Sequence, residues 1–348
     1  MTGVIENMDW QEISRRVTDG GQITRSEALR MLHSSDDELL SVLDAAFTLR
    51  RHHFGRGVRL HVLRNARRGG CSEDCAYCSQ SMRAQPGTAI RQPRPSREEI
   101  VEGAREAHRE GAIRYGVVSS GRGPTDAEVI EMGEIVRAIK AELPLQVCLS
   151  LGLLSPVQAE HLKTYGVDRY HHNLETAERH FPRLCTTHSY KDRVATARAV
   201  QTAGLALCCG GILGVGETAE DRVDLAFALW DLGADTIPVN FLDPRPGTPL
   251  ERQPRMSPAD CLRSLAMFRF VHPAADLCVA GGRESCLGPV QALALYPANA
   301  MFTNGYLTTS GQGGDADRAL LVSVGFQVDE VSHSQCPTRD RTTSGANQ

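Results

Sequence analysis

Hydrophobic and polar positions repeat along the chain in a pattern of two alternating kinds of segment. From residue 58 onward, an amphipathic stretch with apolar residues at helical spacing ends in glycine, and a short β-rich run follows at once. Glycine is the preferred residue just past a helix C-terminus, and an apolar run after it is typical of a buried parallel strand. The pattern therefore predicts helices that alternate with strands. The marking glycines are Gly111, Gly166, Gly204 and Gly233.

Eight such β-rich runs can be counted, and eight strands alternating with helices predict an α/β fold, a parallel (β/α)8 barrel of the TIM type. The runs are 59–65, 113–120, 145–152, 168–175, 205–212, 236–242, 276–282 and 299–305. A doubly wound open sheet is the alternative, but it rarely needs eight such units. Helix starts are marked by Ser96 with Glu99, and by proline at the first helical position after Ser155 and Ser257.

Both ends of the chain differ from this pattern. Residues 1–56 predict a helical extension, with a capping box at Thr24 and Glu27 and apolar positions at helical spacing further on. The barrel is predicted to span 57–327. Residues 328–348 are polar and predict a disordered tail.

Composition narrows the class of protein. The 348 residues carry a formal net charge of −4 with acids and bases mixed throughout, so no basic tract predicts binding to nucleic acid. No apolar run is long enough to predict a membrane span, and the N-terminus has no signal-peptide core. Eleven cysteines without a secretion signal favour metal ligation over disulfides. These features predict a cytoplasmic enzyme that acts on small molecules.

Three cysteines stand within eight residues in the segment Cys71-Ser-Glu-Asp-Cys75-Ala-Tyr-Cys78. Thiolates are the usual ligands of iron–sulfur clusters. The spacing predicts three ligands to a four-iron cube whose fourth iron stays open to a small molecule. A zinc site or reduced structural thiols are the alternative, but structural zinc usually needs a second ligand pair at matching spacing, which the sequence does not offer.

Polar residues at the ends of the predicted strands indicate where chemistry occurs, because barrel enzymes place their active sites there. They include Ser119, Ser120, Asn173, Glu175, Asn240 and Arg283. Cys148, Cys208 and Cys278 lie on the third, fifth and seventh strands, and alternate strands share one layer of a barrel interior. One buried cysteine is usually a small hydrophobe, but three on alternate strands predict a second, deeper metal cluster. Cys209 should face the opposite side of its strand.

The glycine-rich turn from Gly210 to Glu217 joins the fifth strand to a helix at the rim that also carries the three-cysteine segment. Glycine lets backbone approach a flat ligand closely, and the helix N-terminus offers free N–H groups. The turn is therefore a candidate ligand-binding loop, with an ordinary connecting loop as the alternative.

The three-cysteine run, with Tyr77 before its last cysteine, resembles the signature of the radical S-adenosylmethionine (SAM) enzymes. From His52 to Phe326 the chain resembles the biotin synthase family within that superfamily. The resemblance is carried by CSEDCAYCSQS, QVCLSLGLLS, YHHNLET, TTHSYKDR, CCGGILGVGET, IPVNFLDPRPGTPL, AGGRE and GYLTT.

The resemblance implies roles for individual residues. Cys71, Cys75 and Cys78 would hold a [4Fe–4S] cluster that binds and reductively cleaves SAM. Tyr77 and the turn with Ile212, Gly214 and Glu217 would hold adenine. Ser119 and Ser120 would face the methionine amine, and Arg193 its carboxylate. Glu175 stands where the family has aspartate on the ribose hydroxyls. Asn173 and Asn240 would bind the substrate, dethiobiotin, and Asn173 is also a predicted cofactor-binding residue. Arg283 is a third predicted catalytic residue.

The implied reaction is insertion of sulfur into dethiobiotin. Cleavage of SAM gives a radical that removes hydrogen from an unactivated carbon, and the auxiliary cluster supplies the sulfur. Such C–H bonds lie beyond side-chain acid–base chemistry, so the cofactors carry the difficult step. The resemblance also implies a flavodoxin- or ferredoxin-type electron donor, iron–sulfur assembly proteins and a homodimer.

Two positions depart from the family pattern at the auxiliary cluster, a [2Fe–2S] cluster held by three cysteines and one arginine. Cys148 and Cys208 match family cysteines, Gly116 replaces the third, and Cys278 occupies the arginine position. The ligand count stays at three while the geometry changes, so a four-iron variant is an alternative. Cys185 or Cys209 could supply a fourth ligand, whereas Cys261, Cys286 and Cys336 have no predicted site role.

Two other functions remain open from the sequence. A biotin-synthase-like radical SAM enzyme could act on another substrate or mature a metallocofactor without transferring sulfur. Relatives of that kind commonly lack the inner cysteines. An iron–sulfur carrier or redox sensor is the non-enzymatic alternative, but it would not need the adenine turn, Arg193 or the paired asparagines.

Overall fold

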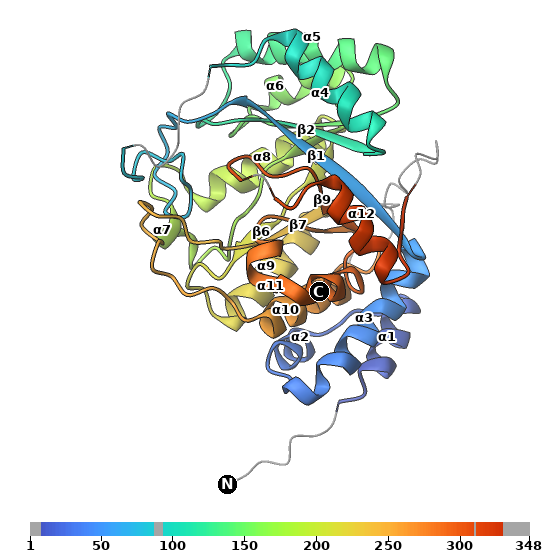
Figure 1. The fold of residues 1–348 in the computed structure, drawn as a ribbon. Coiled ribbons are helices and arrows are strands. Elements are labelled where there is room, and N and C mark those ends of the chain that lie inside the picture. The colour runs from blue at the N-terminus through green and yellow to red at the C-terminus, as the bar shows by residue number, and fades with distance from the viewer. Residues whose placement is uncertain (1–7, 87–92, 310, 330–348) are drawn as a thin grey trace.

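The computed structural model describes residues 8–86, 93–309 and 311–329, and it begins with a small group of helices at the base of the molecule (Figure 1). These are α1 (Trp10–Thr18), α2 (Arg25–Leu32), η1 (Asp36–Glu38) and α3 (Leu39–Phe54). The predicted capping box is present, because Thr24 and Glu27 bind each other's backbone N–H groups. α2 and α3 contact α10 (Pro258–Val271), so the extension is packed onto the main fold.

A closed parallel barrel forms the body of the molecule, as predicted. Its strands are β1 (Gly57–Arg67), β2 (Arg114–Ser119), β3 (Gln146–Ser150), β4 (Arg169–His171), β5 (Ala206–Cys208), β6 (Gly211–Leu213), β7 (Thr236–Phe241), β8 (Asp276–Val279) and β9 (Ala300–Phe302). β5 and β6 both pair with β7 and form one interrupted barrel strand, and pairing of β1 with β9 closes the ring of eight. The two-residue strand β10 (Gln327–Val328), which the sequence pattern did not predict, pairs with β1 outside the ring.

Helices cover the outside of the barrel (Figure 1). They are α4 (Arg97–Arg109), α5 (Asp126–Glu142), α6 (Pro156–Thr164), α7 (Phe181–Leu184), α8 (Tyr190–Thr202), α9 (Ala219–Asp231), α10, α11 (Arg283–Leu287), η2 (Gly288–Leu295) and α12 (Gly314–Ser323). The predicted caps at Ser96, Ser155 and Ser257 each accept a backbone hydrogen bond. The four junction glycines all have positive φ, between 64° and 86°, which L-residues with a side chain rarely adopt.

The amino-terminal end of the barrel is closed by a buried network of charged side chains. Asp276, 2% exposed, accepts from Arg59 at 2.5 Å and from Arg114 at 3.2 Å. Arg114 and Arg169 both donate to the Thr236 hydroxyl at 3.2 Å. Burial opposes ionisation of Asp276, but the guanidiniums of Arg59 and Arg114 outweigh it and hold the pKa of this carboxyl well below its usual range. Arg114 and Thr236 of this network also line the cavity in the barrel interior, so the network forms part of its wall.

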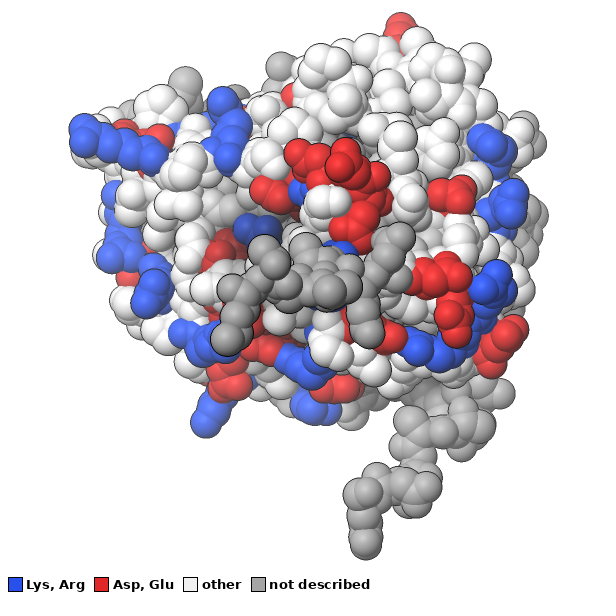
Figure 2. Space-filling view, turned by 90° about the horizontal axis from the view of Figure 1, so that it is seen from below, with Lys and Arg blue, Asp and Glu red and all other residues white. Residues whose placement is uncertain are grey.

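The surface seen from below carries acidic and basic side chains interspersed, with one gathering of acidic groups near its centre (Figure 2). Among the described residues, no helix combines the length and the apolar character needed to cross a bilayer. Of the predicted tail, all residues after Asp329 lie outside the described ranges, and so does Cys336. The division into extension, barrel and tail therefore stays a prediction.

Candidate active site

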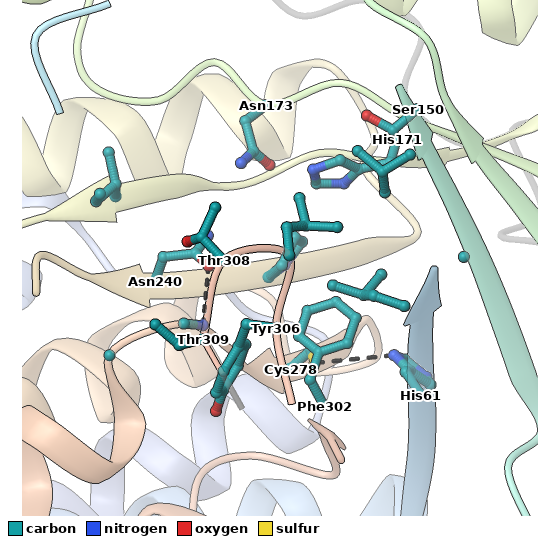
Figure 3. A pocket seen from close by; sticks show the side chains of 18 of the residues that line it. His61, Ser150, His171, Asn173, Asn240, Cys278, Phe302, Tyr306, Thr308 and Thr309 are labelled. Carbon is teal, nitrogen blue, oxygen red and sulfur yellow. Dashed lines mark hydrogen bonds between the residues drawn. The ribbon is translucent and has the colours of Figure 1, made fainter. Parts of the chain in front are cut away.

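A cavity of about 350 Å³ occupies the barrel interior at the carboxyl ends of the strands (Figure 3). Its wall combines side chains that the sequence predicted for a site with apolar groups such as Val118 and Phe302. The predicted residues that line it are Tyr77, Cys78, Cys148, Asn173, Glu175, Cys208, Ile212, Asn240 and Cys278. Residues from strands far apart in the sequence therefore meet in one cavity, as the barrel predicts.

The cluster loop, residues 71–78, follows β1 and lies at the rim of this cavity. Its three cysteines are free thiols, with Cys75 buried and Cys71 and Cys78 partly buried. Glu73 N–H points at Cys71 Sγ at 3.5 Å, and Cys78 N–H donates to the Cys75 carbonyl at 3.1 Å. Burial raises the pKa of the Cys78 thiol to about 11, and the charge of Cys71 adds to the effect. Three thiols close enough to influence one another suit a shared metal cluster.

Asp74 fastens the cluster loop to the segment 184–187. Its carboxylate accepts from Thr186 N–H at 2.8 Å, from the Thr186 hydroxyl at 2.6 Å and from Thr187 N–H at 3.2 Å. Ala76 N–H donates to the Leu184 carbonyl at 2.8 Å. Burial opposes the charge, but the hydrogen bonds from Thr186 outweigh it and lower the pKa of Asp74. The TTHSY segment therefore acts as the support of the cluster loop.

Replacing Asp74 by alanine is expected to loosen the cluster loop and to lower the iron retained at it. Removing an ionised acceptor of several hydrogen bonds costs about 1–3 kcal/mol in the free energy of unfolding. Iron analysis after gel filtration and chemical denaturation measure the two effects. Arg83→Ala is the matched control, because Arg83 lies 3.8 Å from the same carboxylate with its side chain 43% exposed. Equal losses in both variants would contradict a specific role of Asp74.

Asn173, Glu175 and Arg193 form a hydrogen-bonded group beside the cavity. Asn173 Nδ2 donates to Glu175 Oε2 at 3.3 Å, and Arg193 Nη1 donates to the Asn173 carbonyl at 2.8 Å and to Glu175 Oε1 at 3.3 Å. Glu175 has φ of 71°, a conformation that carries strain outside glycine and clusters at functional sites. Arg193 Nε is buried without a partner among the described residues. An unused cationic donor at this place fits an anionic group of a ligand.

Asn240, on β7, turns its side-chain amide toward the same cavity (Figure 3). Its Nδ2 donates to the Gly211 carbonyl at 3.0 Å, and its Oδ1 accepts from Gly281 N–H at 2.9 Å. Because both ends of the amide are held, its orientation is fixed. The remaining lone pair and N–H stay available to a ligand.

The rest of the predicted SAM-binding set lies around the cavity without lining it. Glu217 ties the glycine-rich turn together, because it accepts from Gly214 N–H at 2.8 Å and from Val215 N–H at 2.7 Å. The Ser120 hydroxyl donates to the Gly69 carbonyl at 3.0 Å, and Ser119 lines a separate small recess. These side chains shape the rim rather than the cavity wall.

Arg283, which the sequence placed among the catalytic residues, is not among the residues that line the cavity. Its side chain is 1% exposed, and it donates to Asp317 at 2.6 Å and to Gln291 at 2.7 Å. Its Nε, like that of Arg193, is buried without a hydrogen-bond partner among the described residues. A catalytic role of Arg283 stays a prediction.

Cys148, Cys208 and Cys278 all line the cavity, below the cluster loop, as free thiols. Interaction with Cys208 lowers the pKa of the Cys148 thiol, and His171 Nδ1 lies 3.3 Å from Cys208 Sγ. Three inner thiols in one cavity match the arrangement that alternate strands predict. Their role as metal ligands stays a prediction.

The two cysteines considered as a fourth ligand lie elsewhere. Cys185 packs in one buried cluster with Cys75 of the cluster loop, and its Sγ lies 3.3 Å from His188 Nδ1. Cys209 is fully buried in the hydrophobic core on the other side of β5. Neither lines the cavity, so the structure removes both as partners of the inner thiols.

His61 and His171 were missed as site residues, although both line the cavity. A signal was present for His61, which stands between the apolar residues Leu60 and Val62, whereas His171 lies in the polar run 168–175 and is not set apart from its neighbours. Tyr306 was also missed. It lines the cavity from the segment after β9 and donates to Glu284 at 3.0 Å.

A parallel barrel with three free thiols on a loop at its rim, beside a cavity in its interior, is the arrangement expected of a radical SAM protein. The family model of the Radical SAM superfamily matches residues 68–229, and that of the Biotin and Thiamin Synthesis associated domain matches residues 238–327. The chain belongs to the biotin synthase family.

The assignment to the biotin synthase family rests on the similarity of this chain to curated relatives. Biotin synthase of Salinibacter ruber (strain DSM 13855 / M31) is 49% identical over 342 residues, covering 97% of this chain and 94% of the relative. Biotin synthase of Bacillus subtilis (strain 168) is 43% identical over 323 residues, covering 92% and 96%. A solved methylornithine synthase superposes with a TM-score of 0.80 over 91% of this chain and 97% of its own, at 21% identity, which supports the fold alone.

Proposed function

We propose that the protein converts dethiobiotin to biotin by SAM-dependent sulfur insertion. The observation that carries the proposal is that three free inner thiols line the cavity. The cluster loop and Asn240 border the same cavity. Substrate, SAM and a source of sulfur could share that space. Family membership supports the same reaction, because the curated relatives are named biotin synthase.

The donor chemistry of the described residues fits both cofactors. Cys71, Cys75 and Cys78 would hold a [4Fe–4S] cluster with one iron left for SAM, and Cys148, Cys208 and Cys278 would hold the auxiliary cluster, a [2Fe–2S] or four-iron type. When bound, these groups supply one-electron cleavage of SAM and the sulfur. The unpartnered Arg193 Nε supports binding of the methionine carboxylate.

The chain's own side chains would position the substrate. Dethiobiotin has a cyclic urea, whose carbonyl and N–H groups match the fixed amide of Asn240 and the amide of Asn173. Its aliphatic chain matches apolar wall residues such as Val118 and Phe302.

The wider setting of the reaction rests on the family resemblance. We propose a cytoplasmic enzyme that receives electrons from a flavodoxin- or ferredoxin-type donor and its clusters from iron–sulfur assembly proteins. A homodimer is part of the same proposal.

An anaerobic turnover assay tests the function. Reconstituted protein with SAM, dethiobiotin and a reductant is expected to form biotin together with 5′-deoxyadenosine, both measured by mass spectrometry. A reaction without dethiobiotin is the control for uncoupled SAM cleavage. Cleavage of SAM with no consumption of dethiobiotin would contradict the proposal and favour a relative that acts on another substrate or matures a metallocofactor.

A further inference from the structure

His61 occupies a particular place in the barrel, which the strand register defines. His61 pairs with Arg114 on β2, and Arg114 pairs with Gln146 on β3. Cys148 lies two residues beyond Gln146 on the same strand. The partner of Cys148 two strands on is Ala206, and Cys208 lies two residues beyond it. Each step therefore crosses two strands and rises by two residues.

The same rule completes the circle. The partner of Cys208 across the next two strands is Asp276, and Cys278 lies two residues beyond it. From Cys278 the pairing leads through Ala300 to Arg59, and two residues beyond it stands His61. Four rises of two residues give a total shift of about eight residues around the ring, which is the stagger that a barrel of this type requires. Each interior layer of such a barrel holds four side chains from alternate strands. His61, Cys148, Cys208 and Cys278 therefore make up one layer.

The side chain of His61 meets the cysteines in space. Its Nδ1 lies 3.8 Å from Cys278 Sγ, and the ring points into the cavity (Figure 3). Its Nε2 is buried with no hydrogen-bond partner among the described residues. A buried imidazole nitrogen without a partner is costly, so this ring is suited to a ligand that the protein alone does not supply.

We infer that His61 is the fourth protein ligand of the inner iron–sulfur cluster, which is thus held by three cysteines and one histidine. The inference deepens the proposed function, because it rests on the existence of that cluster. Imidazole is an established ligand of iron in clusters otherwise held by thiolates, where it raises the reduction potential. The cluster thus has a fourth protein ligand although Gly116, on β2 and outside this layer, cannot contribute one.

The arrangement suits a cluster of several irons rather than a single ion. Among the described residues, the only group whose donor atoms all lie within 4.8 Å of one another is Glu73, Cys185 and His188, beside the cluster loop. The four donors of the inner layer are more widely spread, as ligands to different irons are. His171 lies on β4, which belongs to the other set of alternate strands, and we expect it to hydrogen-bond to Cys208.

The test uses the full chain with Cys71→Ala, Cys75→Ala and Cys78→Ala, so that only the inner cluster can form. After anaerobic reconstitution and reduction, pulsed electron paramagnetic resonance is expected to show coupling to one imidazole ¹⁴N, which changes to the ¹⁵N pattern with ¹⁵N-histidine. In this background, His61→Cys is expected to keep the iron and sulfide, lose the nitrogen coupling and lower the reduction potential. His171→Asn is the matched control, and it is expected to keep the coupling.

Four outcomes overturn the inference. Coupling that survives His61→Cys and disappears in His171→Asn assigns the ligand to His171. An iron-loaded cluster without nitrogen coupling in the parent protein excludes a histidine ligand but leaves the sulfur-donating cluster in place. A parent protein that binds no iron overturns the inner cluster and the proposed function with it. If the reduced cluster is magnetically silent, a Mössbauer spectrum in which His61→Cys leaves every iron site unchanged is the overturning result.

Discussion

Replacing Cys148, Cys208 and Cys278 together by alanine is expected to abolish biotin formation while reductive cleavage of SAM continues. The inner thiols would be the protein's attachment for the sulfur source, whereas the cluster loop lies at the rim on a separate segment. Iron in the variant is expected to fall to that of one cube, about four per chain. The converse variant, without Cys71, Cys75 and Cys78, is expected to lose both SAM cleavage and biotin.

Iron and sulfide analysis, Mössbauer spectra and product measurement together decide this prediction. Cys261→Ala is the matched control, because Cys261 is also a fully buried free cysteine but lies on α10, outside the cavity wall. It is expected to keep both clusters and full activity. Equal iron in the wild type and the inner triple variant would mean that the cavity holds no sulfur donor, and the proposed reaction could not proceed by this route.

Replacing Asp276 by asparagine is expected to lower the free energy of unfolding by about 3–5 kcal/mol, because it leaves the surrounding guanidiniums buried without their counter-charge. Both Asp276 and Arg114 have almost no exposed side-chain surface, so water cannot compensate. Urea denaturation at neutral pH measures the change. Asp329→Asn is the matched control, since Asp329 also pairs with Arg59, at 3.2 Å, but is 45% exposed. Its effect is expected to stay below about 1 kcal/mol.

The same carboxyl predicts a pH dependence of stability. The pKa of Asp276 is depressed in the folded protein, while in the unfolded chain it lies near 3.9. Its contribution is therefore fully present above about pH 4 and is lost as the pH falls below that value toward the folded pKa. The difference between wild type and Asp276→Asn should narrow over this acidic range. A difference that stays constant down to the lowest pH at which the protein folds would contradict the role of this charge.

Local sequence signals were sufficient for most of the fold. Strands, helix caps and junction glycines depend on neighbouring residues, and the barrel followed from counting their alternation. The cluster-loop cysteines could be found for the same reason, since their spacing is short. The interruption between β5 and β6 and the short strand β10 were not predicted, because they depend on pairing with distant strands.

Contacts between a side chain and residues far away in the sequence were much harder to predict. Cys185 and Cys209 looked equally available as ligands from the sequence, yet one contacts the cluster loop and the other faces the core. Arg283 follows a strand as a catalytic residue would, yet it does not line the cavity and donates a hydrogen bond to Asp317, 34 positions later. Such choices depend on which segments the closed barrel brings together.

The sequence by itself determined the barrel, the cluster loop and the three alternate strands that carry inner cysteines, because these follow from periodicity and short spacing. Only the tertiary structure decided that His61 joins Cys148, Cys208 and Cys278 in one layer. That layer depends on the stagger between neighbouring strands, which closure of the ring sets and which no single segment encodes.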